Sequence, residues 1–275
     1  MKSQTGMNLI EVMIASVIGV FLITGMMNLF ITTNKSISLS DGISQNQETG
    51  RFAMDYLTKF VRLAGYSSDS SNRSPYISIA SDGIDCALAD ICAVDNLASI
   101  RGDRLALPFS TAQNEIIRSC TGSNVGDPAT PLKYVNIFWV SLEEKDNSGN
   151  IISDRELRCR TYNLTFNTWA DNAVSILSNI EQLHFQVGLA SGETVKQASR
   201  YVSVDQVTDI RLVRSIRVGI LATSLDSIDE NKLKTTVEER RYSVLDGPVF
   251  TPTDGNFRHI FTSTIELPNA IEAAR

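Results

Sequence analysis

Proline is absent from the first 74 residues, histidine occurs only twice, and no charged residue occurs from Val12 to Asn34. The chain also has no G-x-S-x-G, Walker loop, dinucleotide-type glycine pattern or H-E-x-x-H. The usual signatures of hydrolytic, nucleotide-dependent and metal-dependent chemistry are therefore missing. We expect a protein that is not an enzyme and that has no cofactor and no metal site.

The overall composition is that of a folded protein. The chain has 275 residues, of which 43% are hydrophobic and 20% are charged, with a formal net charge of −6. This length favours one main globular domain with an appendage. The acidic balance argues against nucleic acid as a direct partner, because phosphate binding needs concentrated Lys and Arg.

The two histidines, His184 and His259, are poor candidates for chemistry. Neither lies at the spacing of zinc ligands. His184 falls within an apolar strand pattern and His259 lies between Arg258 and Ile260. Each is better explained as a surface residue or a hydrogen-bonded strand residue than as a catalytic base.

The four cysteines are Cys86, Cys92, Cys120 and Cys159, and none forms a C-x-x-C pair. An even number in an exported domain indicates disulfides, and four cysteines allow three pairings. We favour a short loop closed by Cys86 and Cys92, with Cys120 and Cys159 joining two strands. The alternative is four reduced, buried thiols in a cytosolic protein.

The uncharged run from Val12 to Asn34 would span about 34 Å as a helix, enough to cross the hydrocarbon core of a bilayer. A transmembrane segment over about residues 9–31 is the favoured interpretation. A buried core helix and a cleaved secretory signal are alternatives. A secretory signal fits poorly, because its apolar region is shorter and is followed by a small-residue cleavage site. Lys2 in the preceding segment favours a cytoplasmic N-terminus.

Glu11 stands at the start of this apolar run, where an ionised carboxylate is costly unless it is paired. One explanation is a favourable position in the first turn of the helix, close to the headgroups. The other is a cationic partner that enters the membrane with it. Cleavage after Gly6 would create such a cation, because the new amino group of Met7 would lie one helical turn from Glu11.

At these residues the segment KSQTG-MNLIEVMIAS resembles the class III signal of type IV pilins and of type II secretion pseudopilins. The resemblance implies that a prepilin peptidase cuts after Gly6 and methylates Met7. It also implies that Glu11 neutralises the amino terminus of a neighbouring subunit during assembly. Met7 departs from the family, which usually has Phe at this position.

The helix is predicted to extend over residues 7–65 and to end at Gly65. Ala15 and Gly19 form a small-residue face on which another helix could pack, and Gly25 is the point at which a bend is most easily accommodated. Beyond Lys35, helical spacing places one further set of residues on a common stripe: Ile43, Gly50, Met54, Leu57, Val61 and Ala64.

Residues 76–275 contain β-branched and aromatic runs separated by Gly, Asn, Asp and Pro, a pattern typical of antiparallel strands. Eight strands are predicted: Arg104 to Phe109, Glu115 to Cys120, Val135 to Leu142, Glu156 to Phe166, Ile180 to Leu189, Ser215 to Ser224, Arg240 to Leu245, and Phe257 to Leu267. The expected fold class is α+β, with one long helix, half transmembrane and half amphipathic, packed on an antiparallel sheet domain.

The segments SNIEQLHFQVGL, SRYVSVDQV, RSIRVGILATS and FRHIFTSTIELPNA resemble, in this order, the PilW-type minor pilins. The resemblance implies a type IV pilin-like fold. It also implies a subunit that primes assembly of the type IV pilus, with a place at the pilus tip and roles in twitching motility, adhesion or DNA uptake.

The implied partners are other minor pilins, the major pilin, prepilin peptidase and the inner-membrane assembly platform. The chain would be a single-pass inner-membrane protein with a periplasmic domain before assembly, and would be extracellular in the pilus afterwards. A type II secretion minor pseudopilin is the alternative, because it would share every feature up to Gly65. A membrane-anchored periplasmic binding or enzymatic domain is a further one.

Overall fold

The computed structural model describes residues 9–68, 76–79, 86, 91–97, 100–142, 144–145, 148, 151–153, 155–227, 240–252 and 256–273. Gly6 and Met7, at the expected cleavage site, lie outside these residues.

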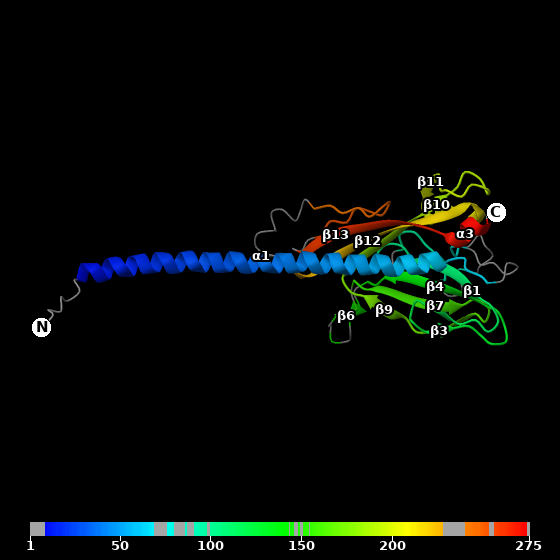
Figure 1. Cartoon of the computed structure of the whole chain (residues 1–275), viewed down its shortest axis with the longest axis horizontal. Coiled ribbons are helices and arrows are strands. Elements are labelled where there is room, and N and C mark those ends of the chain that lie inside the picture. Colours follow the sequence, from blue (N-terminus) through cyan, green and yellow to red (C-terminus); the bar gives the residue numbers. More distant parts are fainter. Residues whose placement is uncertain are drawn as a thin grey trace.

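One helix dominates the chain (Figure 1). Helix α1 (Leu9–Leu63) has 55 residues, which corresponds to a length of about 83 Å. It continues without interruption through Gly25, in keeping with the absence of proline. The helix ends where the sequence predicted, because Gly65 adopts a left-handed φ of +70°. The N–H of Gly65 donates to the carbonyl of Pro108 at 2.8 Å, which turns the chain onto the domain.

The two halves of α1 have different environments. In the first half, from Leu9 to Asp41, nearly every side chain is exposed. The residues of α1 that are buried begin at Asn46 and are Asn46, Gly50, Ala53, Met54, Leu57, Phe60 and Val61. Five of the six stripe residues predicted from helical spacing are thus buried, counting Ala64 just beyond the helix, while Ile43 is only partly covered.

The domain contains two antiparallel sheets. The first has the order β1–β4–β7–β8, with β9 also pairing with β7. Its strands are β1 (Leu105–Thr111), β4 (Leu132–Val140), β7 (Leu157–Asn163), β8 (Thr168–Trp169) and β9 (Val174–Leu177). The second has the order β11–β10–β12–β13. Its strands are β10 (Ile180–Leu189), β11 (Arg200–Val202), β12 (Val213–Ser227) and β13 (Asn256–Glu266).

Short elements complete the described part of the domain. Two small hairpins are formed by β2 (Ile117–Arg118) with β3 (Asn124–Val125), and by β5 (Glu144–Lys145) with β6 (Ile151–Ser153). Two short 3-10 helices, η2 (Val204–Gln206) and η3 (Ile210–Leu212), precede β12, and helix α3 (Pro268–Ala273) follows β13. The side-chain amide of Asn269 in α3 donates to the carbonyl of Ala64 at 2.9 Å, which satisfies one of the free carbonyls at the end of α1.

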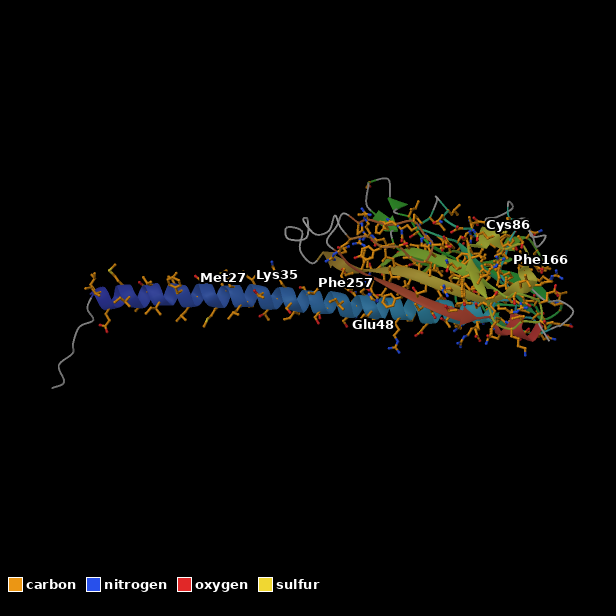
Figure 2. All side chains as sticks on the ribbon, turned by 90° about the horizontal axis from the view of Figure 1, so that it is seen from above. Met27, Lys35, Glu48, Cys86, Phe166 and Phe257 are labelled. Atoms are coloured by element: carbon orange, nitrogen blue, oxygen red, sulfur yellow. A yellow bond between two sulfur atoms is a disulfide. The ribbon has the colours of Figure 1, made fainter. Side chains whose placement is uncertain are left out.

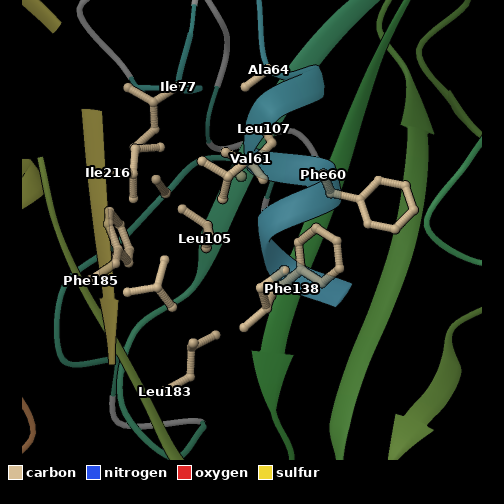
Figure 3. Packing of buried hydrophobic residues seen from close by; sticks show 14 of the residues in the cluster. Phe60, Val61, Ala64, Ile77, Leu105, Leu107, Phe138, Leu183, Phe185 and Ile216 are labelled. Atoms are coloured by element: carbon tan, nitrogen blue, oxygen red, sulfur yellow. The ribbon is translucent and has the colours of Figure 1, made fainter. Parts of the chain in front are cut away.

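The buried half of α1 packs against both sheets (Figure 3). Phe60 contacts Phe138 of β4, with ring centroids 5.6 Å apart. Val61 belongs to the same hydrophobic cluster as Phe185 of β10 and Ile216 of β12. At Gly50 the helix approaches β13 so closely that an added Cβ would lie 2.0 Å from the ring of Phe261. The second half of the helix is therefore part of the core.

The structure confirms the predicted α+β class and corrects two strands. The segment Arg240 to Leu245 is not a strand and forms only an isolated bridge between Tyr242 and Phe250. It packs across the second sheet, where Val244 and Leu245 lie over Gly219 of β12. The strand predicted over Glu115 to Cys120 is reduced to the two residues of β2, because the N–H of Glu115 closes a turn on the carbonyl of Ala112 at 3.2 Å and the N–H of Cys120 donates to the Asn136 side chain at 3.1 Å.

Candidate functional site: the exposed helix and the clusters of the domain

The first half of α1 is a long apolar surface without partners in the domain (Figure 2). Its best 18-residue window has a mean hydropathy of 2.3, and none of that window is buried in the structure. Leu9 is 74% exposed and Phe21 is 76% exposed. Length and composition allow this helix to cross a membrane. An apolar surface of this size requires a lipid or protein environment.

Three hydroxyl side chains within this half form hydrogen bonds to the helix itself. The hydroxyls of Ser16, Thr24 and Thr32 donate to backbone carbonyls three or four residues earlier, each at 2.8 Å. Such internal bonding is what a helix needs where no water is available. Glu11 is different, because it lies in the first turn of the helix, exposed, and carries a formal charge.

Ala15 and Gly19 lie in the same apolar half of α1 as Glu11. A Cβ added at Gly19 would meet no atom within 4 Å, so this face of the helix is open to another chain. Since Gly6 and Met7 lie outside the described residues, the structure does not place the amino group expected after cleavage. The roles of Gly6, Met7, Glu11, Ala15 and Gly19 remain predictions.

Both disulfides that the sequence favoured are present. Cys86 is bonded to Cys92, with Cα atoms 5.3 Å apart, and Cys120 is bonded to Cys159, with Cα atoms 6.2 Å apart. No cysteine is free. The second bond joins β7 to the segment after β2, and the hydroxyl of Tyr56 on α1 donates to the carbonyl of Cys120. The helix is thereby attached to the disulfide-linked part of the domain.

A buried acidic cluster lies beside β10. The Asp103 carboxylate is fully buried and accepts from His184 Nδ1 at 2.9 Å, from the N–H of Phe185 at 2.8 Å and from the N–H of Asn96 at 2.9 Å. Asp95 lies next to it and is half-buried. Burial raises the pKa of Asp95 to about 6, helped by the negative charge of Asp103, by a side-chain hydrogen bond to Asp103, and by the charges of Asp205 and Asp246.

The sequence analysis missed this cluster. Asp103 and His184 are 81 positions apart, and a parallel bridge between Gly102 and Leu183 brings them together. The interpretation of His184 as a hydrogen-bonded strand residue is correct, because its Nδ1 atom pairs with Asp103. His259 is exposed on β13, and its ring packs against Phe261.

A known protein family matches the second half of the chain. Residues 138–269 match the family of the type IV pilus-assembly protein W, PilW. The PilW-type resemblance is confirmed. The matched region runs from the end of β4 to α3 and so contains the whole second sheet, whereas α1 lies outside it. No curated protein matches the chain.

Among solved structures, a type IV-like pilin from Thermus thermophilus aligns with the chain at 14% sequence identity and a TM-score of 0.37. The alignment covers 84% of this chain and 96% of that pilin.

The PilW match and the apolar N-terminal helix together support a pilin-type role for this chain. A type IV pilus-assembly family implies interaction with other pilus components. The helix also fits membrane anchoring.

Proposed function

We propose that this chain is a minor pilin of the type IV pilus. The observation that carries the proposal is the division of α1, whose first half is apolar and uncovered while its second half is part of the domain core. A protein with this division needs a second environment for the uncovered half. The membrane supplies that environment before assembly, and the helices of other pilins supply it in the filament.

Processing is the first step of the proposed mechanism. Prepilin peptidase removes residues 1–6 after Gly6 and methylates the new amino terminus at Met7. The chain is held in the inner membrane by the first half of α1 both before and after this cut. The domain that begins near residue 76 lies on the periplasmic side, where its two disulfides form.

Glu11 provides the charge interaction of the proposed assembly step. A carboxylate in an apolar environment is stabilised by a cation close to it. In the membrane that cation is the Met7 amine of the same chain, and in the filament it is the amine of a neighbouring subunit. Ala15 and Gly19 then allow a neighbouring helix to approach closely.

The domain provides the contacts that distinguish this subunit from others. We infer that it contacts other minor pilins and the major pilin, that it helps to prime assembly on the inner-membrane platform, and that it stays at or near the pilus tip. Its function is structural, since the chain has none of the common catalytic motifs sought above. Loss of the protein is expected to reduce pilus-dependent twitching motility, adhesion or DNA uptake.

The assembly step is tested with Glu11→Ala. We expect this variant to be cleaved and membrane-bound but depleted from sheared pili, because the charge partner of the neighbouring amine is missing. Glu48→Ala is the matched control, since Glu48 is an exposed glutamate of the same helix beyond the apolar half. Recovery of Glu11→Ala in sheared pili at the level of Glu48→Ala would contradict the role given to Glu11.

The processing step is tested by the mass of the N-terminal peptide in cells with and without prepilin peptidase. A peptide that begins at N-methylated Met7, found only with the peptidase, is the expected result. An intact N-terminus in both strains would favour a membrane-anchored periplasmic domain. A deletion that abolishes enzyme secretion but leaves pili and motility normal would assign the chain to a type II secretion pseudopilus.

A further inference from the structure

We propose that Asp95, Asp103 and His184 form a binding site for a divalent cation. One oxygen from each carboxylate and one nitrogen of the imidazole ring lie within 4.8 Å of one another. Ligands of a zinc ion lie about 2.0–2.2 Å from the metal, so two of them are at most about 4.4 Å apart. A small inward movement of the half-buried Asp95 side chain would bring all three ligand atoms within this limit.

His184 is poised to act as a ligand. Its side chain is fully buried, and its Nδ1 atom faces the Asp103 carboxylate at 2.9 Å. Its Nε2 atom is buried and has no hydrogen-bond partner among the described residues. Because Nε2 has no partner, the proton that Nδ1 donates to Asp103 can move to Nε2 when a cation binds, and the Nδ1 lone pair then faces the cation.

The backbone around the ring is built to hold it. A Cβ at Gly102 would lie 3.0 Å from His184 Nε2, and a Cβ at Gly247 would lie 2.4 Å from the same atom. Gly102 also has a left-handed φ of +102°. Two glycines thus allow the chain to close on the ring from two segments, and a ring held in this way keeps Nδ1 directed at the carboxylates.

The charge around the site is negative. Asp205 and Asp246 are exposed carboxylates whose charges act on Asp95. Among the described residues, no Lys or Arg forms an ion pair with Asp95, Asp103, Asp205 or Asp246. A cation bound by the two inner carboxylates would offset this charge, and the outer two would attract it from solution.

The ligand chemistry selects the class of cation. Two carboxylates with one imidazole suit Zn²⁺ or Mn²⁺, whereas Ca²⁺ and Mg²⁺ prefer oxygen ligands alone. A bound ion would link the segment before β1 directly to β10, beyond the bridge that joins them now. We expect the ion to stabilise the domain rather than to take part in catalysis.

Zinc binding to the full-length protein in detergent, after removal of metals with EDTA, tests the site by calorimetry. We expect one Zn²⁺ site in the wild type and at least a ~10-fold weaker affinity in Asp95→Asn. His259→Gln removes the other histidine, and Asp209→Asn removes a carboxylate that pairs with Arg211 away from the site, so both are expected to bind Zn²⁺ as the wild type does. Equal affinity of wild type and Asp95→Asn, a loss in His259→Gln, or tighter binding of Ca²⁺ than of Zn²⁺ would overturn the proposal.

A second measurement follows the ligand directly and does not depend on a variant in the site. Protein labelled with ¹⁵N-histidine has only two imidazole rings, and His259→Gln assigns their signals. We expect Zn²⁺ to shift the nitrogen signals of His184 and to leave those of His259 in place. A shift confined to His259, or no shift of either ring, would refute ligation by His184.

Discussion

Replacing Glu181 with glutamine removes the charge that balances the buried guanidinium of Arg258. Glu181 is 2% exposed on β10, and Arg258 is 4% exposed on β13. Arg258 donates to both carboxylate oxygens of Glu181, with its Nη2 atom 2.9 Å from Oε1. Strand β12 lies between β10 and β13, so this ion pair ties the edge strand to the interior of the sheet.

The cost of this change follows from the burial. Removing one partner of a buried ion pair costs about 3–5 kcal/mol, because the remaining charge is left without compensation. Glutamine keeps one carbonyl oxygen that can still accept from Arg258, which places the expected loss near the lower end, at about 3 kcal/mol. For a domain of this size that loss corresponds to a fall of roughly 6–12 °C in melting temperature.

Thermal unfolding of the full-length protein in detergent, followed by circular dichroism, measures the effect. Glu193→Gln is the control, because Glu193 pairs with Arg211 at 2.9 Å on the surface, where both side chains are more than half exposed. The control should melt as the wild type does. The double variant Glu181→Leu/Arg258→Met should recover most of the loss, since it removes both buried charges, while Arg155, which also pairs with Glu181 at 3.4 Å, is partly exposed. A Glu181→Gln melting temperature equal to that of the control would refute the reasoning.

Three further predictions concern the core, the acidic cluster and the longer disulfide. Gly50→Val should cost about 1–3 kcal/mol by overpacking, and Phe261→Ala should relieve part of that cost, as a double-mutant cycle would measure. In metal-free protein Asp95→Asn should be more stable than wild type at pH 7, by on the order of 1 kcal/mol after screening, because the folded state raises the pKa of Asp95. The stability difference between Asp95→Asn and wild type should disappear as the pH falls through about 6 towards 4. An equal stability difference at pH 7 and at about pH 4 would contradict this prediction. Removing the bond between Cys120 and Cys159, 39 residues apart, should cost ~4 kcal/mol, against ~2 kcal/mol for the shorter disulfide, in denaturant titrations of serine variants.

The helix was predictable because its signals are local. Each signal occupies a short stretch of sequence: the absence of proline, the uncharged run and the stop at Gly65. The stripe of buried residues from Gly50 to Val61 follows from the helical period alone. The strand Ile180–Leu189 was predicted with its observed bounds for the same reason, since an apolar run is flanked there by turn residues. The observed disulfides are the favoured one of the three pairings that four cysteines allow.

The features that the sequence did not predict depend on contacts between distant segments. The Arg240–Leu245 segment has the composition of a strand, yet Val244 is buried by packing on the face of β12 rather than by pairing at an edge. The division into two sheets is set by which strands pair, and strand composition does not encode pairing. The meeting of Asp103 with His184 depends on a single parallel bridge, which no sequence period indicates.

The exposed half of α1 also bears on how a pilin would choose between membrane and filament. Burying its large side chains away from water is favourable by roughly 1.5–3 kcal/mol each, so the helix is strongly driven out of water. Lipid tails are as apolar as other helices, however, and moving from one to the other yields no comparable hydrophobic gain. The preference for the filament must then come from terms that differ between the two environments. Under the proposed function, these terms are the charge of Glu11 and the close approach of a neighbouring helix at Ala15 and Gly19. This is why Glu11→Ala is expected to spare membrane insertion and to impair incorporation into pili.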